Sequence, residues 1–332
     1  MKRVLITGGG GFIGSHLVDA LLGRGVEVAV YDHLPAERAR NLDAVRGCIR
    51  YVQGDIRDEQ ALEKLVDSGL SCIYHLASVV GVRHYVADPL AVVDVIVGGT
   101  RGVLGLARRH GVKTVIASTS EVFGKNPAVP WKEDADRVLG CTTVDRWSYA
   151  SAKGVCEHMA FALARAGLPV SIVRFFNAYG PRQAPDYVIS QTVWKALRGE
   201  PPLLYDSGAQ TRCFTYVEDI VRGVIAVGET AVANGESFNL GNPVETSIQA
   251  VVEQIVALAG VEVGVTPFRT EVEYGDRYED IPRRIPSVEK AARILGWRAQ
   301  TSLDKGLVST IDWARAHPWW LGVPDPAVAA GR

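Results

Sequence analysis

The sequence lacks an excess of either charge, because its 332 residues include 36 basic and 37 acidic side chains. It has no basic stretch interleaved with aromatics, the pattern that favours nucleic-acid binding, so we expect no nucleic-acid partner. A phosphorylated ligand would have to be held by a few local donors rather than by the field of the whole protein.

Cysteine is scarce as well, and no two cysteines are spaced as Cys-x-x-Cys. The five are widely scattered: Cys48, Cys72, Cys141, Cys156 and Cys213. An odd number without metal-ligand spacing indicates neither a disulfide framework nor a metal site. We expect reduced thiols, most of them buried, and no metal.

Long hydrophobic runs are missing too, since no apolar stretch approaches the roughly 18 residues that a membrane span needs. Only Val-Leu-Ile separates the N-terminal Met-Lys-Arg from Thr7-Gly8, which is too short for the apolar core of a signal peptide. We therefore expect a cytoplasmic protein without a membrane partner.

Short apolar runs alternate with amphipathic stretches through the first half of the chain. Runs typical of buried parallel strands lie at 4–6, 28–30, 51–52, 73–74, 115–116 and 170–173. Helical patterns lie at 15–22, 59–66, 90–109 and 149–165, and later at 189–197, 217–228 and 248–259. The alternation predicts an α/β fold, a Rossmann-type doubly wound parallel sheet with a smaller C-terminal α+β lobe.

The helix expected over residues 149–165 is apolar almost all round, whereas a helix lying on a sheet should keep a polar outer face. A second subunit that covers it is the simplest explanation. We therefore expect a homodimer formed through the helices over residues 90–109 and 149–165. A covering loop of the same chain is the alternative.

A glycine-rich turn follows the first strand, with the sequence Thr7-Gly-Gly-Gly-Gly-Phe-Ile-Gly14. Its glycines allow a close backbone approach, so the N-terminus of the next helix can face a pyrophosphate. Asp32 ends the second strand, where an acid accepts hydrogen bonds from a ribose 2′-hydroxyl and repels a 2′-phosphate, which predicts NAD rather than NADP. The residues expected to contact NAD are Gly8, Gly11, Phe12, Ile13, Gly14, Asp32, Asp55, Ile56, Leu76, Ala77, Tyr149 and Lys153.

Tyr149 and Lys153 are four residues apart and therefore share one face of a helix. An ammonium group beside the phenol favours the phenolate and can lower its pKa from about 10 toward neutrality. Such a phenolate can take a proton from a sugar hydroxyl while a nicotinamide takes the hydride. Thr119 and Glu121 lie upstream in Ser118-Thr-Ser-Glu121 and complete the expected catalytic set.

These motifs resemble the extended short-chain dehydrogenases/reductases that modify nucleotide sugars, over about residues 1–315. The matching segments are 7–14, 75–77, 118–124, 149–153, 174–182 and 210–219. The resemblance implies that tightly held NAD transiently oxidises a sugar 4-hydroxyl, that a second event follows, and that the hydride returns. It also implies that Asn177 and Arg212 contact the sugar diphosphate, and it places Arg182 among the substrate-binding residues. A structural arginine that ties the lobes together is the alternative for Arg212.

The domain organisation follows from the same pattern. We expect an NAD-binding Rossmann domain made of residues 1–178 and 213–242. A nucleotide-sugar-binding lobe would comprise 179–212 and 243–318, and residues 321–332 would form a flexible tail.

Glu121 indicates which second event follows the oxidation. A carboxylate beside C5 does little for an inversion at C4, but it is useful where C5 becomes a carbanion next to a 4-ketone. UDP-glucuronate decarboxylases (UDP-xylose synthases) resemble the chain at 117–124, at His84-Tyr85 and at Arg284-Ile-Pro-Ser287. By that resemblance Arg284 and Ser120 would hold the substrate carboxylate, while Glu121 would position the ring or a water that protonates C5.

Other interpretations stay open. Arg284 could belong to a surface pair with Arg283. A 4,6-dehydratase is the second possible enzyme, although dTDP-glucose dehydratases place an Asp where Ser120 stands, and GDP-mannose dehydratases use NADP. Arg146-Trp-Ser-Tyr149 also occurs in epimerases, which keeps a UDP-sugar 4-epimerase acting on UDP-glucose or UDP-glucuronate open. An NAD-sensing regulator is the alternative that is not an enzyme, but such members have lost the Tyr or Lys that this chain retains.

Overall fold

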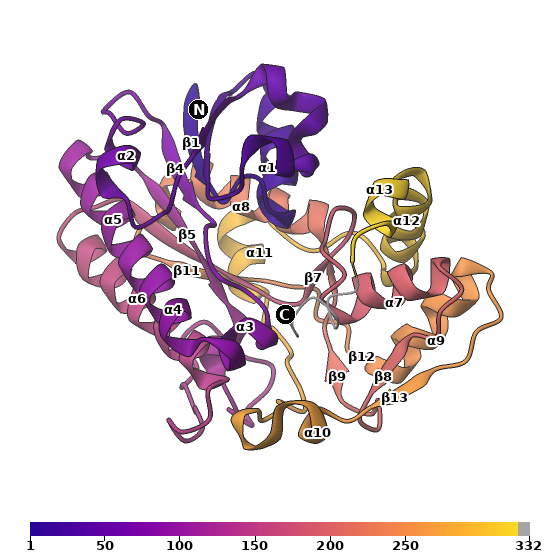
Figure 1. The fold of residues 1–332 in the computed structure, drawn as a ribbon. Helices are drawn as coiled ribbons and strands as arrows, with labels where there is room; N and C mark the ends of the chain where they lie inside the picture. Colours follow the sequence, from indigo (N-terminus) through magenta and orange to yellow (C-terminus); the bar gives the residue numbers. More distant parts are fainter. Residues whose placement is uncertain (325–332) are drawn as a thin grey trace.

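The computed structural model describes residues 1–324 and contains a seven-stranded parallel sheet between two layers of helices (Figure 1). The strand order is β11-β6-β5-β4-β1-β2-β3. The strands are β1 (Arg3–Thr7), β2 (Glu27–Asp32), β3 (Arg50–Gln53), β4 (Cys72–His75), β5 (Thr114–Thr119), β6 (Val170–Phe175) and β11 (Ser237–Leu240). The six strands expected from the sequence are present, and the predicted fold class is confirmed.

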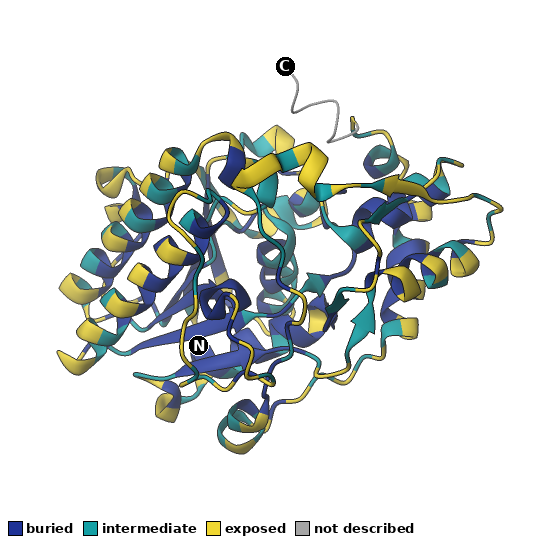
Figure 2. Cartoon of the chain, turned by 90° about the horizontal axis from the view of Figure 1, so that it is seen from below, coloured by how far each residue is buried: buried dark blue, intermediate teal, exposed yellow. Residues whose placement is uncertain are grey.

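Alternate residues of a buried strand face opposite helix layers. In β1, Val4 and Ile6 pack with one layer, whereas Leu5 packs with the other. The first layer holds α1 (Phe12–Leu22), α8 (Val217–Glu229) and α11 (Glu289–Leu295), and the second holds α2 (Glu59–Glu63), α5 (Gly99–His110) and α6 (Trp147–Arg165). Figure 2 shows the strands buried and the exposed helix faces turned outward.

The chain returns to the sheet after an excursion, as the sequence predicts. Helix α8 covers the sheet, and β11 pairs in parallel with β6, so that Ser237 lies beside Ile172. The domain boundaries that we expected stay predictions.

The smaller lobe has its own buried cluster, in which Trp194, Val251 and Leu307 take part. Its helices are α7 (Val188–Leu197), α9 (Ile248–Ala259), α12 (Leu303–Ala316) and α13 (Pro318–Leu321). Its short strands pair as β7 (Ala178–Tyr179) with β10 (Thr215–Tyr216), β8 (Leu203–Tyr205) with β13 (Thr266–Phe268), and β9 (Thr211–Arg212) with β12 (Thr246–Ser247). Leu321, the first residue of the expected tail, ends α13 and accepts a hydrogen bond from Trp194. The predicted tail beyond residue 324 lies outside the described residues.

The helix expected over 90–109 is interrupted, because a π-helical turn η3 (Asp94–Gly98) separates α4 (Pro89–Val93) from α5. The combined helix Pro89–His110 is long and apolar enough, by length and composition, to cross a membrane. This helix contradicts the expectation that no apolar stretch approaches the length of a membrane span. Val103 and Leu104 of this helix are buried against the sheet, as in core helices of soluble proteins, which pass the same test.

Candidate active site

The glycine-rich turn needs glycine at two positions. Gly8 has a positive φ of 75°, and a Cβ there would lie 2.7 Å from the backbone nitrogen of Ala77. A Cβ on Gly14 would lie 2.2 Å from the carbonyl oxygen of Gly8. Helix α1 begins at Phe12, and no side chain caps its N-terminus at Gly11. The free N–H groups of that first turn suit a pyrophosphate.

Asp32, at the end of β2, contacts the glycine-rich turn. Its Oδ2 accepts a hydrogen bond from the backbone N–H of Gly10 at 2.8 Å, and its Oδ1 accepts one from Leu34 at 3.1 Å. Burial opposes ionisation, but hydrogen bonds from His33, Leu34 and Gly10 outweigh it and lower the pKa of Asp32. An ionised carboxylate beside a glycine cradle fits the ribose of a dinucleotide.

The other residues expected to contact NAD lie at the carboxyl ends of neighbouring strands. Asp55 follows β3, and hydrogen bonding to Arg57 lowers its pKa to about 2. Ile56 is buried, and Leu76 and Ala77 follow β4 beside the glycine-rich turn. The residues present therefore fit NAD.

Three of the four expected catalytic residues meet where β5 and α6 lie side by side. Lys153 donates from Nζ to the carbonyl oxygen of Ala117 at 2.9 Å, and its Nζ lies 5.9 Å from the centre of the Tyr149 ring. Thr119 accepts a hydrogen bond from the backbone N–H of Glu121 at 3.2 Å and also hydrogen-bonds Tyr149. Tyr149, Lys153 and Thr119 are buried.

In the structure the pKa of Tyr149 shifts in the direction opposite to the one expected from the sequence. Burial raises the pKa of the phenol, and the negative charge of Glu121 raises it further. Burial also lowers the pKa of Lys153 to about 8, although Cys156 and Glu157 oppose this shift. The phenol is therefore protonated in the protein alone, and its activation needs a further positive charge beside the ring.

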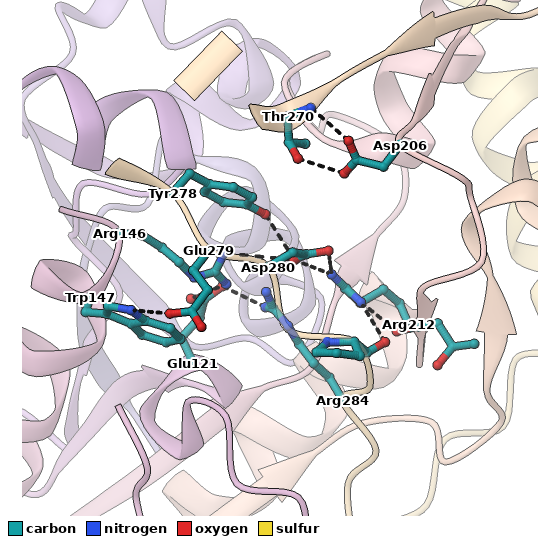
Figure 3. A network of polar contacts seen from close by, with 12 residues as sticks. Glu121, Arg146, Trp147, Asp206, Arg212, Thr270, Tyr278, Glu279, Asp280 and Arg284 are labelled. Atoms are coloured by element: carbon teal, nitrogen blue, oxygen red, sulfur yellow. Dashed lines mark hydrogen bonds and ion pairs between the residues drawn. The ribbon is translucent and has the colours of Figure 1, made fainter. Parts of the chain in front are cut away.

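Glu121 is held between two arginines (Figure 3). Arg284 donates from Nη1 to Oε1 of Glu121 at 2.6 Å, and Arg146 donates from Nη2 to Oε2 at 3.0 Å. The side chain of Arg146 is 0% exposed, that of Arg284 8% and that of Glu121 12%. Arg284 is therefore not a surface residue, in contrast to Arg283, which is exposed.

A second, partly buried carboxylate lies next to this group. Asp280 accepts two hydrogen bonds from Arg212, at 2.8 and 3.0 Å, and lies 4.0 Å from Nη1 of Arg146. Burial opposes the ionisation of Glu121, but Arg146 and Arg284 lower its pKa, while Arg212, Arg284 and Arg146 do the same for Asp280.

We call these five residues the arginine–carboxylate cluster: Glu121, Arg146, Arg212, Asp280 and Arg284. Three guanidinium groups face two ionised carboxylates, so the cluster carries one surplus positive charge. Sequence reasoning missed two of its members. Arg146 stands in Arg146-Trp-Ser-Tyr149, and its position three residues before Tyr149 is the signal that could have identified it. No sequence pattern points to Asp280.

The remaining predicted substrate residues are spread around this centre. Ser120 is buried next to Glu121 in the short helix η4 (Ser120–Phe123). Asn177 has a φ of 35°, and its buried Oδ1 has no hydrogen-bond partner among the residues that the structure describes, which leaves an acceptor for a ligand. Arg182 pairs with Asp19 of α1 at 2.7 Å, so it lies on the side of the glycine-rich turn rather than in the cluster. Contacts of these residues with substrate stay predictions.

Asp280 also borders an open cleft of about 470 Å³. A volume of about 300–1,000 Å³ is usual for sites that bind small molecules. The cleft is lined by Asp206, Ser207, Ala209, Gln210, Thr211, Glu245, Asp280, Pro282 and Arg283.

Comparison with known proteins identifies the family. A family model described as GDP-mannose 4,6 dehydratase matches residues 5–310. The chain is 38% identical to UDP-N-acetyl-alpha-D-glucosaminuronate decarboxylase of Bacillus cytotoxicus, over 95% of this chain and 98% of the relative. It is 36% identical to UDP-glucuronic acid decarboxylase 1 of Xenopus tropicalis, over 100% of this chain and 78% of the relative. The chain belongs to the extended short-chain dehydrogenase/reductase family that modifies nucleotide sugars.

Solved structures of this family have the same fold. The dTDP-glucose 4,6-dehydratase of Streptomyces venezuelae, solved with NAD, is 31% identical and superposes with a TM-score of 0.86, covering 96% of this chain and 98% of that one. The chain is thus an extended short-chain dehydrogenase/reductase enzyme, as its motifs predict. The family includes decarboxylases, dehydratases and epimerases, so the reaction has to be argued from the site.

Proposed function

We propose that this family member is an NAD-dependent UDP-glucuronate decarboxylase that gives UDP-xylose, or the UDP-4-keto-pentose if the final reduction is slow. One observation carries the proposal: Glu121 faces two buried arginines beside Tyr149. Because one carboxylate neutralises only one of them, the site has a positive charge to spare for the C6 carboxylate of a hexuronate.

The cofactor would lie on the glycine-rich turn with Asp32 at its ribose, and when bound it would accept the C4 hydride and later return it. The residues of the chain position and deprotonate the substrate. Thr119 orients the 4-hydroxyl, and Tyr149 takes its proton. Lys153 supplies positive charge to the same pocket, and NAD, when bound there, would supply the further positive charge that a buried phenolate requires.

The second event is the loss of CO₂ from a 4-keto acid. The C5–C6 bond breaks, its electron pair passes into the 4-ketone as an enolate, and CO₂ leaves. C5 then takes a proton from water. Glu121 does not supply that proton because Arg146 and Arg284 keep it ionised. Its carboxylate instead orders the groups around C5 and C6.

The same geometry argues against the alternatives. A 4,6-dehydratase must protonate a leaving hydroxyl, but Glu121 is ionised and Ser120 is neutral, so neither is a suitable acid. The hydroxymethyl group of UDP-glucose would leave the cluster with its surplus charge, which disfavours a 4-epimerase acting on that sugar.

UDP-N-acetylglucosaminuronate is a second candidate substrate. The relative from Bacillus cytotoxicus, 38% identical over almost the whole chain, carries that substrate in its name. The two uronates share the C6 carboxylate and differ at C2, so the arginine–carboxylate cluster fits both.

Mass spectrometry after incubation with UDP-glucuronate, UDP-N-acetylglucosaminuronate, UDP-glucose and dTDP-glucose tests the proposal. Decarboxylation removes the mass of CO₂ from a uronate, whereas dehydration removes the mass of water from a hexose. An unchanged mass together with a new sugar on chromatography indicates epimerisation. We expect CO₂ loss from at least one uronate and no change in either hexose.

We also propose that the enzyme is a homodimer formed through the helices over residues 90–109 and 149–165. The exposed Leu90 and Val155, which are 70% and 46% accessible, support this surface. Light scattering on the purified chain and on Val155→Glu tests it, because a charge in the interface should give monomers.

A further inference from the structure

The two arginines that hold Glu121 differ in how firmly they are held themselves. We propose that Arg146 is a fixed anchor that keeps Glu121 ionised, while Arg284 is exchanged between Glu121 and the carboxylate of the substrate. The inference rests on the proposed function. It assigns a positioning role to Arg146, a residue that was not among the site residues expected from the sequence.

Arg146 is fixed from several sides. Its guanidinium lies over the ring of Trp147 at 5.2 Å and over the ring of Tyr278 at 4.9 Å. Its backbone N–H donates to the carbonyl oxygen of Arg277 at 3.2 Å, and its side chain is 0% exposed. It also precedes Tyr149 by a single helical turn, so a shift of Arg146 would be transmitted to the catalytic phenol.

Arg146 also has spare donors. Its Nε and Nη1 are buried and have no hydrogen-bond partner among residues 1–324, and Asp280 lies 4.0 Å from Nη1. Asp280 already accepts two hydrogen bonds from Arg212, whereas Glu121 accepts one from Arg146 at 3.0 Å, so Glu121 is the carboxylate that Arg146 contacts directly.

Arg284 is held by fewer interactions than Arg146. It comes from the irregular segment between Pro282 and Pro286, not from a helix or a sheet strand. Within the described part of the chain it makes one hydrogen bond, to a single oxygen of Glu121, and its buried Nε has no partner there. A guanidinium that uses one donor can turn its remaining donors to a second carboxylate.

The charges explain why both arginines are needed. If Arg284 were the sole partner, its transfer to the substrate would leave Glu121 as a bare buried carboxylate, which would take up a proton. With Arg146 in place, Glu121 stays ionised while Arg284 binds the substrate. Each of the two carboxylates then has one guanidinium until CO₂ leaves, after which Arg284 returns to Glu121. The repulsion between the carboxylates is relieved by the bond cleavage, which favours the forward step.

Four variants of the full chain with bound NAD test the anchor on UDP-glucuronate, or on UDP-N-acetylglucosaminuronate if only that uronate is used. They are Arg146→Gln, Arg146→Lys, Arg284→Gln and the control Arg137→Lys. Arg137 is a suitable control because it joins the same two segments through the carbonyl oxygens of Val122 and Ala150, without a carboxylate partner.

We expect substitution of Arg284 to change mainly KM and substitution of Arg146 to change mainly kcat. Arg284→Gln should raise KM by about tenfold or more, whereas Arg146→Gln should lower kcat by about tenfold with KM changed less than about threefold. Without Arg146 the pKa of Glu121 rises, so the acidic limb of kcat should move up by about one pH unit. Arg146→Lys should restore part of kcat, and Arg137→Lys should match the unmodified enzyme. A rise in KM for Arg146→Gln with an unmoved acidic limb would overturn the anchor.

A titration that needs no turnover separates this inference from the proposed function. The infrared band of the protonated Glu121 carboxyl is identified by its absence in Glu121→Gln. It should appear at higher pH in Arg146→Gln than in the unmodified chain. If neither uronate is decarboxylated, the proposed function fails and this titration still decides the anchor. Equal titration in both proteins rejects it.

Discussion

The ring of Tyr85 lies flat against the ring of Tyr149, with 4.5 Å between centroids and 7° between the planes. Tyr85 comes from α3 (Val82–Ala87), and its hydroxyl accepts a hydrogen bond from the backbone N–H of Gly81 at 2.8 Å. Both tyrosines are buried. The stacked ring limits the rotation of the catalytic phenol, so α3 helps to fix the orientation of Tyr149.

Two substitutions of Tyr85 distinguish the contribution of its ring from that of its hydroxyl. Tyr85→Phe keeps the stacked ring and should retain most of kcat. Tyr85→Ala opens a cavity beside Tyr149, which should cost about 3–5 kcal/mol of stability and reduce kcat more than KM. Denaturant unfolding and steady-state kinetics measure both effects. Equal kcat values for the two variants would show that the ring does not orient Tyr149.

Tyr149→Phe tests whether the chain acts as an enzyme through this residue. The variant keeps the ring and its stacking but cannot take a proton, so turnover should fall by about a hundredfold or more. NAD should stay bound, as measured by chromatography of the cofactor released on denaturation. A regulator that only senses NAD would instead retain its activity in this variant.

The sequence predicted the parts of the site that local patterns determine. The spacing of glycines after β1, the acid at the end of β2 and the pair Tyr149 and Lys153 each lie within one element or one turn. Their neighbours could be inferred because parallel strands bring their carboxyl ends to one edge of the sheet.

The arginine–carboxylate cluster could not be inferred in this way. Glu121 is 25 residues from Arg146 and 163 residues from Arg284, and the last of these contacts depends on an irregular segment without periodicity. The direction of the Tyr149 pKa was also missed. It depends on the burial of the ring and on the charge of Glu121, which a four-residue spacing does not reveal.

The lowered pKa of Lys153 predicts a pH-dependent stability. The unfolded chain binds a proton at this lysine up to its ordinary pKa of 10.5, whereas the folded chain releases it at about 8. Stability should therefore rise with pH between these values and fall as the pH drops toward 8. Relative to Lys153→Met, the unmodified protein should gain about 1.5 kcal/mol between pH ~8 and ~9.5, as measured by denaturant unfolding. A constant difference between the two proteins would contradict the shift.

Asp32 should determine the choice of cofactor. Asp32→Asn removes the negative charge that repels a 2′-phosphate, so the ratio of the Kd values for NADP and NAD should fall by about tenfold, the effect of about 1.4 kcal/mol. Fluorescence titration of the cofactor-free protein measures both constants. Because Asn keeps only one of the two oxygens that accept hydrogen bonds from Gly10 and Leu34, denaturant unfolding of the variant checks that it stays folded. If the ratio of the two Kd values equalled that of the unmodified protein, Asp32 would stabilise the turn without selecting the cofactor.

Glu121→Gln tests both the chemistry and the packing of the cluster. The variant leaves Arg146 and Arg284 buried without a negative partner, so the free energy of unfolding should fall by about 3–5 kcal/mol. The exposed pair of Glu229 and Arg24 provides a control, since Glu229→Gln should cost less than about 1 kcal/mol. Turnover of the uronate should fall by about a hundredfold in Glu121→Gln at a pH where the variant is folded. If the variant turned over at the normal rate, Glu121 would have no part in the chemistry at C5, and the cluster would be reduced to a support for the fold.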